Sequence, residues 1–205
     1  MSNFIVIAFY TEDTPYQELI QTCLEPSLTA LDIDYQLFRK ENLGSWIKNV
    51  AMKPRIISEA LRMFPKQYRI ICLDADSEVV SYPFLFDEIP DDYHIGYHTL
   101  NWNEWYGYNH HPPFMEVLSG TMWINNTHQT KIIVDEWCQR AQHTSIWEQK
   151  ILGDVIQTHP EIKSYSLPLE YCYISSLPDG RKPLIQTNPV IVHHQASRKY
   201  KKQIR

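Results

Sequence analysis

The chain has 205 residues, of which 43% are hydrophobic, and a formal net charge of -5 at pH 7. This length and composition fit one globular domain with a substantial core, and the mild charge gives no indication of nucleic-acid binding. No stretch approaches the about 20 apolar residues of a membrane span, and residues 1–13 lack the basic start of a signal peptide. We therefore expect a cytoplasmic protein whose cysteines are reduced.

The first part of the chain predicts alternating strands and helices. Thr14, Pro15 and Gln17 are typical of a helix start, with Thr14 and Gln17 as a capping box. A second helix is expected from Pro54, because apolar residues recur there at helical spacing. Apolar runs predict strands at 4–10, 33–39 and 69–75. This order predicts a parallel sheet with helices on both sides.

After residue 80 the pattern changes. Helices are expected from Thr127 and from Ser145, the second with a capping box between Ser145 and Glu148. An aromatic loop, 100–113, separates two expected strands, 93–99 and 117–126. Short strands are expected near the end of the chain, at 164–168 and 189–194. We predict one α/β domain with a central, mostly parallel sheet flanked by helices. Such a sheet binds ligands outside the carboxyl ends of its strands.

Two acids follow the third expected strand. In an extended chain, residues i and i+2 point to the same face, so Asp74 and Asp76 would project together. Two carboxylates suit Mg²⁺ or Mn²⁺, and such an ion can bridge the phosphates of a nucleotide diphosphate. The alternative is structural: Asp76 caps a turn and Asp74 forms local hydrogen bonds.

Two later segments also combine a strand with polar or small residues. His193 lies at a strand end and is compatible with Mn²⁺, and Lys199, six residues later, could neutralise a phosphate. Ser119 and Gly120 interrupt an apolar strand, which allows either close approach of a ligand or a β-bulge. The basic C-terminal segment, 197–205, is interpreted as a solvated tail, with weak contact to a membrane surface as the alternative.

A helix start and the aromatic loop complete the candidate site. Glu148 and Gln149 open a helix and are expected to face the crevice, unless Glu148 serves only as a cap. The loop suits sugar stacking or forms a small satellite core through its aromatic residues, Trp102, Trp105, Tyr106 and Tyr108.

In this order, the segments resemble glycosyltransferases of the GT-A fold. The closest resemblance is to the glycosyltransferase family 8 type, glycogenin-like and lipopolysaccharide galactosyltransferase-like, and to related nucleotide-diphospho-sugar transferases. The segment LDADSEVVSYPFLF resembles the D-x-D strand of these enzymes and is the strongest match. The others are AFYT (nucleotide cradle), MKPRIISEAL (K-P-x-x-I helix), SGTMWINNT (donor-sugar segment), EQKIL (D-Q segment) and VHHQASRK (closing H-F-x-G-x-x-K motif).

The resemblance implies a metal-dependent transfer of a hexose from UDP-glucose or UDP-galactose to a saccharide or glycoconjugate, with retention. It assigns Asp74, Asp76 and His193 to Mn²⁺ or Mg²⁺, and Glu148 and Gln149 to catalysis. Donor and cofactor binding would involve Ala8, Phe9, Tyr10, Thr11, Lys53, Asp74, Ala75, Asp76, Ser119, Gly120 and Lys199. The chain would divide into a nucleotide-binding half, a sugar and acceptor half, and a closing motif with a tail: 1–80, 81–190 and 191–205.

The closing motif departs from the family pattern. Ala196 stands where the family has Gly, and Tyr200 stands where it has Pro, so His194 and Arg198 remain alternatives to the two assigned residues. Glu148 replaces the usual Asp. Two other functions remain open: a module that binds a nucleotide sugar or glycan without turnover, and a nucleotidyltransferase. Against the second, the segment AFYTEDTP has no basic, glycine-rich phosphate loop.

Overall fold

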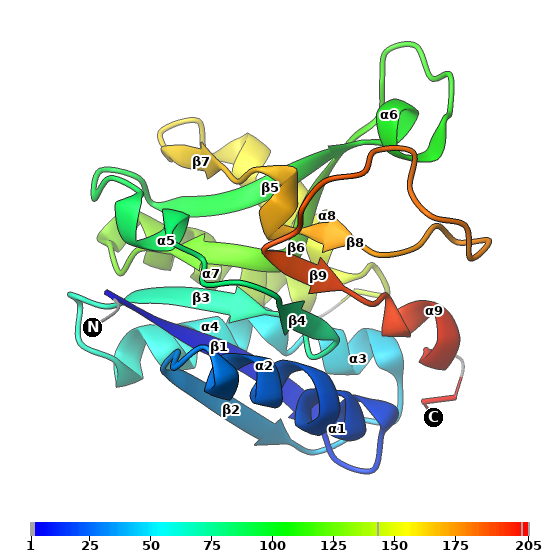
Figure 1. Cartoon of the computed structure of the whole chain (residues 1–205). Helices are drawn as coiled ribbons and strands as arrows, with labels where there is room; N and C mark the ends of the chain where they lie inside the picture. The colour runs from blue at the N-terminus through cyan, green and yellow to red at the C-terminus, as the bar shows by residue number, and fades with distance from the viewer. Residues whose placement is uncertain (1–2, 143, 202, 205) are drawn as a thin grey trace.

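The fold is built on a six-stranded mixed sheet (Figure 1), seen in a computed structural model that describes residues 3–142, 144–201 and 203–204. The strand order is β2-β1-β3-β6-β5-β7. The strands are β1 (Phe4–Thr11), β2 (Tyr35–Lys40), β3 (Arg69–Leu73), β5 (Ile95–Asn101), β6 (Met115–Ile124) and β7 (Ser164–Ser166). β1 is parallel to β2 and β3, and β7 to β5, whereas β6 runs antiparallel between β3 and β5. The predicted α/β class with a mostly parallel sheet is confirmed.

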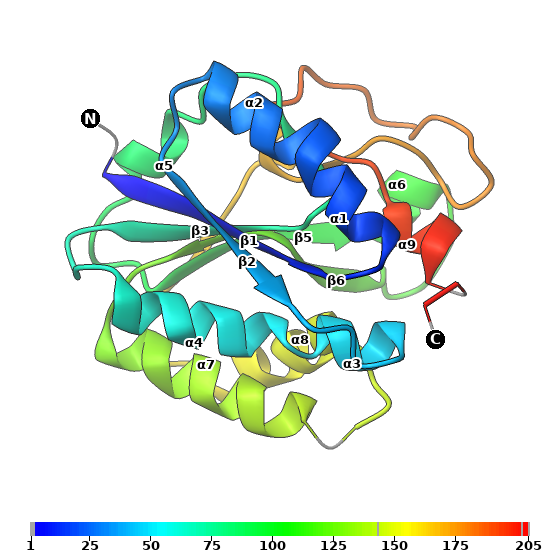
Figure 2. The same ribbon diagram turned by 90° about the horizontal axis from the view of Figure 1, so that it is seen from below.

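Helices cover both faces of this sheet, because apolar side chains of each strand alternate between the faces. Figure 2 shows α4 (Lys53–Met63), α7 (His128–Ala141) and α8 (Glu148–Thr158) on one side. On the other side lie α1 (Pro15–Leu19), η1 (Ile20–Leu24), α2 (Glu25–Ala30) and α5 (Leu85–Glu88). Ile7 and Ile70 accordingly belong to the core between the sheet and α4, α7 and α8. Val6 and Ile71 belong to the core on the opposite face, beneath η1, α2 and α5.

A second, three-stranded sheet pairs a strand from the C-terminal part of the chain with the short strand that follows Asp74 and Asp76. Its order is β4-β9-β8, with β4 (Ser77–Val79), β9 (Ile191–His193) and β8 (Tyr173–Ile174). β9 pairs antiparallel with β4, so that Ser77 lies opposite His193. The remaining elements are α3 (Trp46–Val50), α6 (Trp102–Tyr106), η2 (Leu169–Tyr171) and α9 (Ala196–Tyr200). No helix within the described part of the chain is long and apolar enough to cross a membrane.

The structure corrects two predicted capping boxes and one predicted helix start. Thr14 precedes α1, but its hydroxyl donates to the Thr11 carbonyl at 2.8 Å and makes no cap bond to the helix. α8 begins at Glu148 after an N-cap at Trp147, so the predicted start at Ser145 and its capping box are wrong. The reason is that the Glu148 carboxylate bonds to Ser119 and Lys53 instead.

Candidate active site

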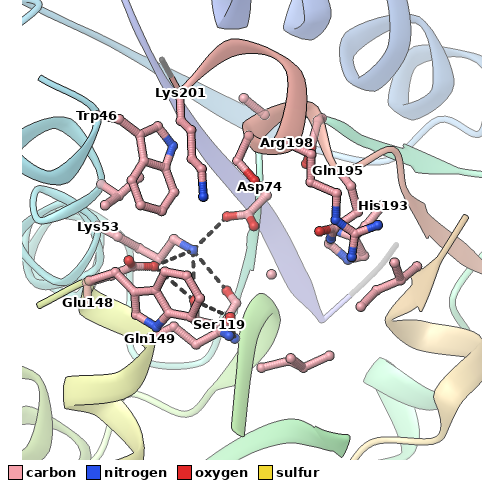
Figure 3. Close-up of a pocket in the computed structure, with 18 of the residues that line it drawn as sticks. Trp46, Lys53, Asp74, Ser119, Glu148, Gln149, His193, Gln195, Arg198 and Lys201 are labelled. Carbon is pink, nitrogen blue, oxygen red and sulfur yellow. Dashed lines mark hydrogen bonds and ion pairs between the residues drawn. The ribbon is translucent and has the colours of Figure 1, made fainter. Parts of the chain in front are cut away.

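A cavity of about 390 Å³ opens at the edge of the main sheet where β1 and β3 end (Figure 3). Its volume lies within the range of small-molecule sites. Most of the predicted site residues line it: Phe9, Tyr10, Thr11, Lys53, Asp74, Ala75, Asp76, Ser119, Gly120, Glu148, Gln149 and His193. Ala8 lies instead in the buried core. Lys199 also lies outside the lining, with its ammonium 4.8 Å from the Tyr200 ring.

Asp74 and Asp76 lie in a turn between β3 and β4, closed by a 3.1 Å hydrogen bond from the Ser77 amide to the Asp74 carbonyl. The expectation of an extended chain is therefore wrong, yet the two carboxylates still converge. Together with His193 they offer ligand atoms that all lie within 4.8 Å of one another. One oxygen of Asp76 accepts from the Ala196 amide at 2.6 Å.

His193 enters this group from β9 as a buried, neutral side chain. Its Nε2 lies 2.8 Å from the Thr121 hydroxyl, and its Nδ1 lies 3.2 Å from the Ser77 hydroxyl. Burial lowers the pKa of His193 to about 4, so the ring keeps a lone pair that can bind a metal. The alternative residue, His194, lies outside the group and contacts Glu78 at 3.0 Å.

The three donors fit a divalent metal. Two carboxylates and one imidazole suit Mn²⁺ or Mg²⁺. Burial, followed by the nearby Asp74 charge, raises the pKa of Asp76 to about 6, and the repulsion between the two carboxylates is the part of this shift that a bound cation would relieve. Gly120 leaves the space in which the donors meet, because a Cβ there would lie 2.8 Å from His193 Cε1 and 3.2 Å from Asp74 Oδ2.

The close approach at Gly120 and the predicted bulge occur together. Tyr97 of β5 pairs with Met122, whereas Thr99 pairs with Val117, so the ladder between β5 and β6 is interrupted over 118–121. This irregularity confirms the β-bulge and brings Gly120 close to Asp74 and His193, whereas the approach of a ligand at this segment stays a prediction.

Lys53 supplies the positive charge that two acids at the end of a buried strand require. Its side chain is buried, and its ammonium lies 2.6 Å from Asp74 Oδ1 and 3.1 Å from Glu148 Oε1 (Figure 3). It also donates to the hydroxyl and the carbonyl of Ser119, at 3.0 and 3.2 Å. Burial lowers the pKa of Lys53, but the two carboxylates outweigh this effect, so the net pKa lies above its ordinary value.

Glu148 and Gln149 face the cavity. Glu148 accepts from the Ser119 hydroxyl at 3.0 Å. Gln149 Oε1 accepts from the Ser119 amide at 3.0 Å, and its Nε2 donates to Glu116 Oε1 at 2.8 Å. The alternative in which Glu148 only caps a helix is therefore wrong.

Solved structures with a similar fold include several glycosyltransferases. A glycosyltransferase involved in the glycosylation of the major capsid of PBCV-1 matches with a TM-score of 0.67, covering 96% of each chain at 15% identity. Mouse xyloside xylosyltransferase 1 matches with a TM-score of 0.57, covering 95% of this chain and 98% of its own at 12% identity. The galactosyltransferase LgtC, in complex with donor and acceptor sugar analogs, matches with a TM-score of 0.55, covering 94% of this chain and 87% of its own at 10% identity.

This chain has the GT-A fold. The fold implied by the ordered motifs is thus confirmed, whereas membership of family 8 stays a prediction. No protein-family model matches the chain, and no curated protein matches it.

Two tryptophans that the motifs did not include line the cavity of this GT-A fold. Trp46 of α3 and Trp147 stand edge to face, with ring centroids 6.2 Å apart. The Lys201 ammonium lies 5.8 Å from the Trp46 ring. Arg198 and Lys201, rather than Lys199, are the basic residues of the closing segment that line the cavity. The predicted tail also includes Lys202 and Arg205, which lie outside the described residues.

Polar residues at the site that were missed from the sequence include Glu116 and Thr121. Glu116 lines the cavity, and Thr121 orients His193. An acid within a largely apolar strand was an available signal for Glu116. For Thr121 the sequence offers no signal, because its partner comes from a strand 72 residues away.

Proposed function

We propose that this chain is a metal-dependent glycosyltransferase. It would move a hexose from a nucleotide-diphosphate sugar to a hydroxyl group of a saccharide or glycoconjugate. UDP-glucose and UDP-galactose are the first candidate donors, and retention is the expected outcome, both from the motif resemblance. The observation that carries the proposal is the convergence of Asp74, Asp76 and neutral His193 in the cavity of a GT-A fold.

The chain's own residues would divide the work along the cavity. Phe9, Tyr10 and Thr11 at the end of β1 would receive the base and ribose. Mn²⁺ or Mg²⁺ held by the Asp-Asp-His group would stabilise charge on the diphosphate. Arg198 and Lys201 would take the phosphate-neutralising role expected of the closing motif, because they line the cavity.

Lys53 and Ser119 would hold the reaction centre in place. Lys53 fixes the carboxylates of Asp74 and Glu148, and Ser119 fixes Glu148 and Gln149, which we assign to orienting the donor sugar. In the transfer, the bond between the anomeric carbon and the diphosphate oxygen breaks, and its electron pair leaves on the diphosphate. A bond forms between the anomeric carbon and the acceptor oxygen, and the proton of that hydroxyl passes to an oxygen of the departing diphosphate.

The proposal is tested by thermal unfolding with UDP, GDP, CDP and their sugars, with and without Mn²⁺ or Mg²⁺. We expect one nucleotide to stabilise the protein only when the metal is present, by about 2.7 kcal/mol at a hundredfold excess over Kd. The effect should disappear in Asp76→Asn and persist in Asp154→Asn, a control on the exposed side of α8. No metal-dependent shift with any nucleotide would contradict the proposal.

Consumption of the donor then separates an enzyme from a binding module. We expect release of nucleoside diphosphate from the stabilising nucleotide sugar, at least by slow hydrolysis. A metal-dependent shift without any release would favour the binding module. Release of pyrophosphate from a nucleoside triphosphate and a sugar phosphate would favour the nucleotidyltransferase.

A further inference from the structure

The short helix α6 presents aromatic side chains to two different environments. Trp105 is 1% exposed and packs in a core with Leu100 and Leu118. Trp102 and Tyr106, four residues apart and so on the same helix face, line the cavity. Their ring centroids are 5.3 Å apart with an interplanar angle of 73°. One helix therefore contributes Trp105 to a satellite core and Trp102 and Tyr106 to the cavity lining, and we call these two side chains the aromatic wall.

This aromatic wall lies across the acid pair from the end of β1. In the sheet order β1-β3-β6-β5, three strand spacings separate β1 from β5, which is about 14 Å. α6 follows β5 directly, and Asp74 follows β3, between the two. A ligand that contacts β1 and the acid pair therefore leaves the aromatic end of the cavity for a second ligand.

Glu116 joins the aromatic wall to the reaction centre. Its Oε2 accepts from Trp102 Nε1 at 2.7 Å, and its Oε1 accepts from Gln149 Nε2 at 2.8 Å. The Gln149 oxygen is directed to Ser119, so Glu116 fixes the orientation of this amide. Each carboxylate oxygen has a second lone pair, and Glu116 can therefore also accept from a ligand hydroxyl.

The closing segment reaches the same end of the cavity. Burial raises the pKa of the Tyr106 phenol, while the nearby Arg198 guanidinium opposes this shift. Arg198 also donates to the Ser176 carbonyl, which ties α9 to the segment after β8. The aromatic wall is thus partly shielded from water, as ring stacking on an apolar surface requires.

We propose that Trp102, Tyr106 and Glu116 form the acceptor-sugar subsite. A pyranose ring packs on the aromatic wall, and one of its hydroxyls bonds to Glu116, which positions it beside Gln149. The apolar C–H face of a pyranose suits an aromatic ring, and its hydroxyls suit a carboxylate. This subsite rests on the proposed function and deepens it, because it assigns acceptor selectivity to one end of the cavity.

The test compares Glu116→Gln and Trp102→Phe with Glu104→Gln. Glu116→Gln keeps the side-chain shape but places an amide against two N–H donors, and Trp102→Phe keeps a ring but loses the N–H. Glu104 is a matched control, because it is an exposed acid of α6 that accepts from Asn101 and does not line this cavity. The probes are p-nitrophenyl α- and β-pyranosides of glucose, galactose and xylose, with the donor that gives the largest thermal shift.

We expect the acceptor KM to rise about tenfold or more in Glu116→Gln, as for a lost charged hydrogen bond. Trp102→Phe should show a smaller rise in the same direction, and Glu104→Gln none. In all three variants the metal-dependent thermal shift with UDP should match the wild type. In Glu116→Gln and Trp102→Phe, kcat should fall less than KM rises. This split separates positioning of the acceptor from a general loss of structure.

Three results would overturn the subsite. The first is an unchanged acceptor KM in both Glu116→Gln and Trp102→Phe. The second is loss of the UDP shift in Glu116→Gln, which places this residue on the donor side. The third is a wild-type protein with an intact UDP shift that gives neither product nor saturation-transfer NMR signal with any pyranoside of the panel. A wild-type protein without any metal-dependent nucleotide shift would instead overturn the proposed function itself.

Discussion

Lys53 explains how a buried strand can end in two acids. Its ammonium lies within 3.2 Å of four oxygens, on Asp74, Glu148 and Ser119. An ammonium has three N–H donors, so these contacts already saturate it. We infer that Lys53 holds the carboxylates in place. Direct contact with the donor, its predicted role, would require Lys53 to release one of these oxygens.

Removing this cation should destabilise the protein strongly. In Lys53→Met, two carboxylates lose their buried partner, and we expect a loss of about 3 kcal/mol or more in the free energy of unfolding, measured with urea. The matched control is Lys40→Met, which removes a partly exposed ion pair with Glu59 and should cost less than about 1 kcal/mol. Adding Glu148→Gln should recover part of the loss. Equal effects of the two lysine variants would contradict this interpretation.

Gly120 should be required for the metal group. Gly120→Ala would place a methyl group 2.8 Å from His193 Cε1, so we expect the metal-dependent nucleotide shift to disappear. Gly153→Ala is the control, because its nearest neighbour would lie at 3.8 Å and alanine stabilises the interior of α8 by up to about 1 kcal/mol. Thermal unfolding measures both effects, and a wild-type shift in Gly120→Ala would contradict the prediction.

At this scale the sequence indicated the residues that converge in the cavity better than the residues that support them. Asp74 and His193 were found because polar residues directly follow apolar runs. The extended-chain argument was wrong because the Ser77 amide closes a turn at that point. Glu116 and its partner Gln149 are 33 residues apart, and no local pattern reports such a contact.

Among the elements, those with a strong periodicity were predictable. The strands β1 and β3 and the helices α4 and α7 follow from apolar runs or an apolar face. β4 and β8 contain three and two residues, and β9 pairs with both. Such short strands exist because of tertiary pairing, so their own residues carry little signal. The start of α8 was misplaced because Glu148 bonds to the site rather than to a helix cap.

The contact between α7 and the end of α8 should depend on pH. His159 Nε2 lies 2.6 Å from Glu136, and its Nδ1 lies 2.8 Å from Glu161. Bonds to Glu136 and then Glu161 raise the pKa of His159. The stabilisation is therefore present below the unfolded-state pKa of histidine and is lost as the pH rises through the folded-state pKa.

We therefore expect His159→Gln to be less stable than the wild type at pH 5.5 by about 0.5 kcal/mol, as for an exposed ion pair. The difference should shrink towards pH 8.5, because the stabilisation is lost as the pH rises through the folded-state pKa. Urea unfolding at the two pH values measures it. A difference that is equal at both values, or larger at pH 8.5, would contradict the role of the charged ring.

For the whole molecule, the C-terminal segment joins the two sheets to the site. β9 is the central strand of the small sheet. Its Ile191 is fully buried in the core that lies beneath η1, α2 and α5. Ala196 follows it and bonds to Asp76. This arrangement makes the segment part of the core as well as of the site.

Two truncations should separate these roles. A chain that ends at Asn188 lacks β9, so we expect it to lose cooperative unfolding. A chain that ends at Gln195 keeps β9 and should remain folded, although it loses the buried Ile204 and about 2 kcal/mol. It should also lose most of the metal-dependent nucleotide shift, because Arg198 and Lys201 are gone. Circular dichroism and thermal unfolding measure both, and a cooperative transition in the shorter chain would contradict the first expectation.

The position of His193 on β9 makes docking of the C-terminal segment and ion occupancy a single linked equilibrium. An ion bound by Asp74, Asp76 and His193 would cross-link the two sheets, so a chelator should speed amide hydrogen exchange over 191–200. Linkage is reciprocal, and anything that frees β9 must weaken ion affinity by the same factor. A substitution in β8, which pairs with β9 and carries none of these three residues, could then be mistaken in an assay for a defect in the proposed donor pocket.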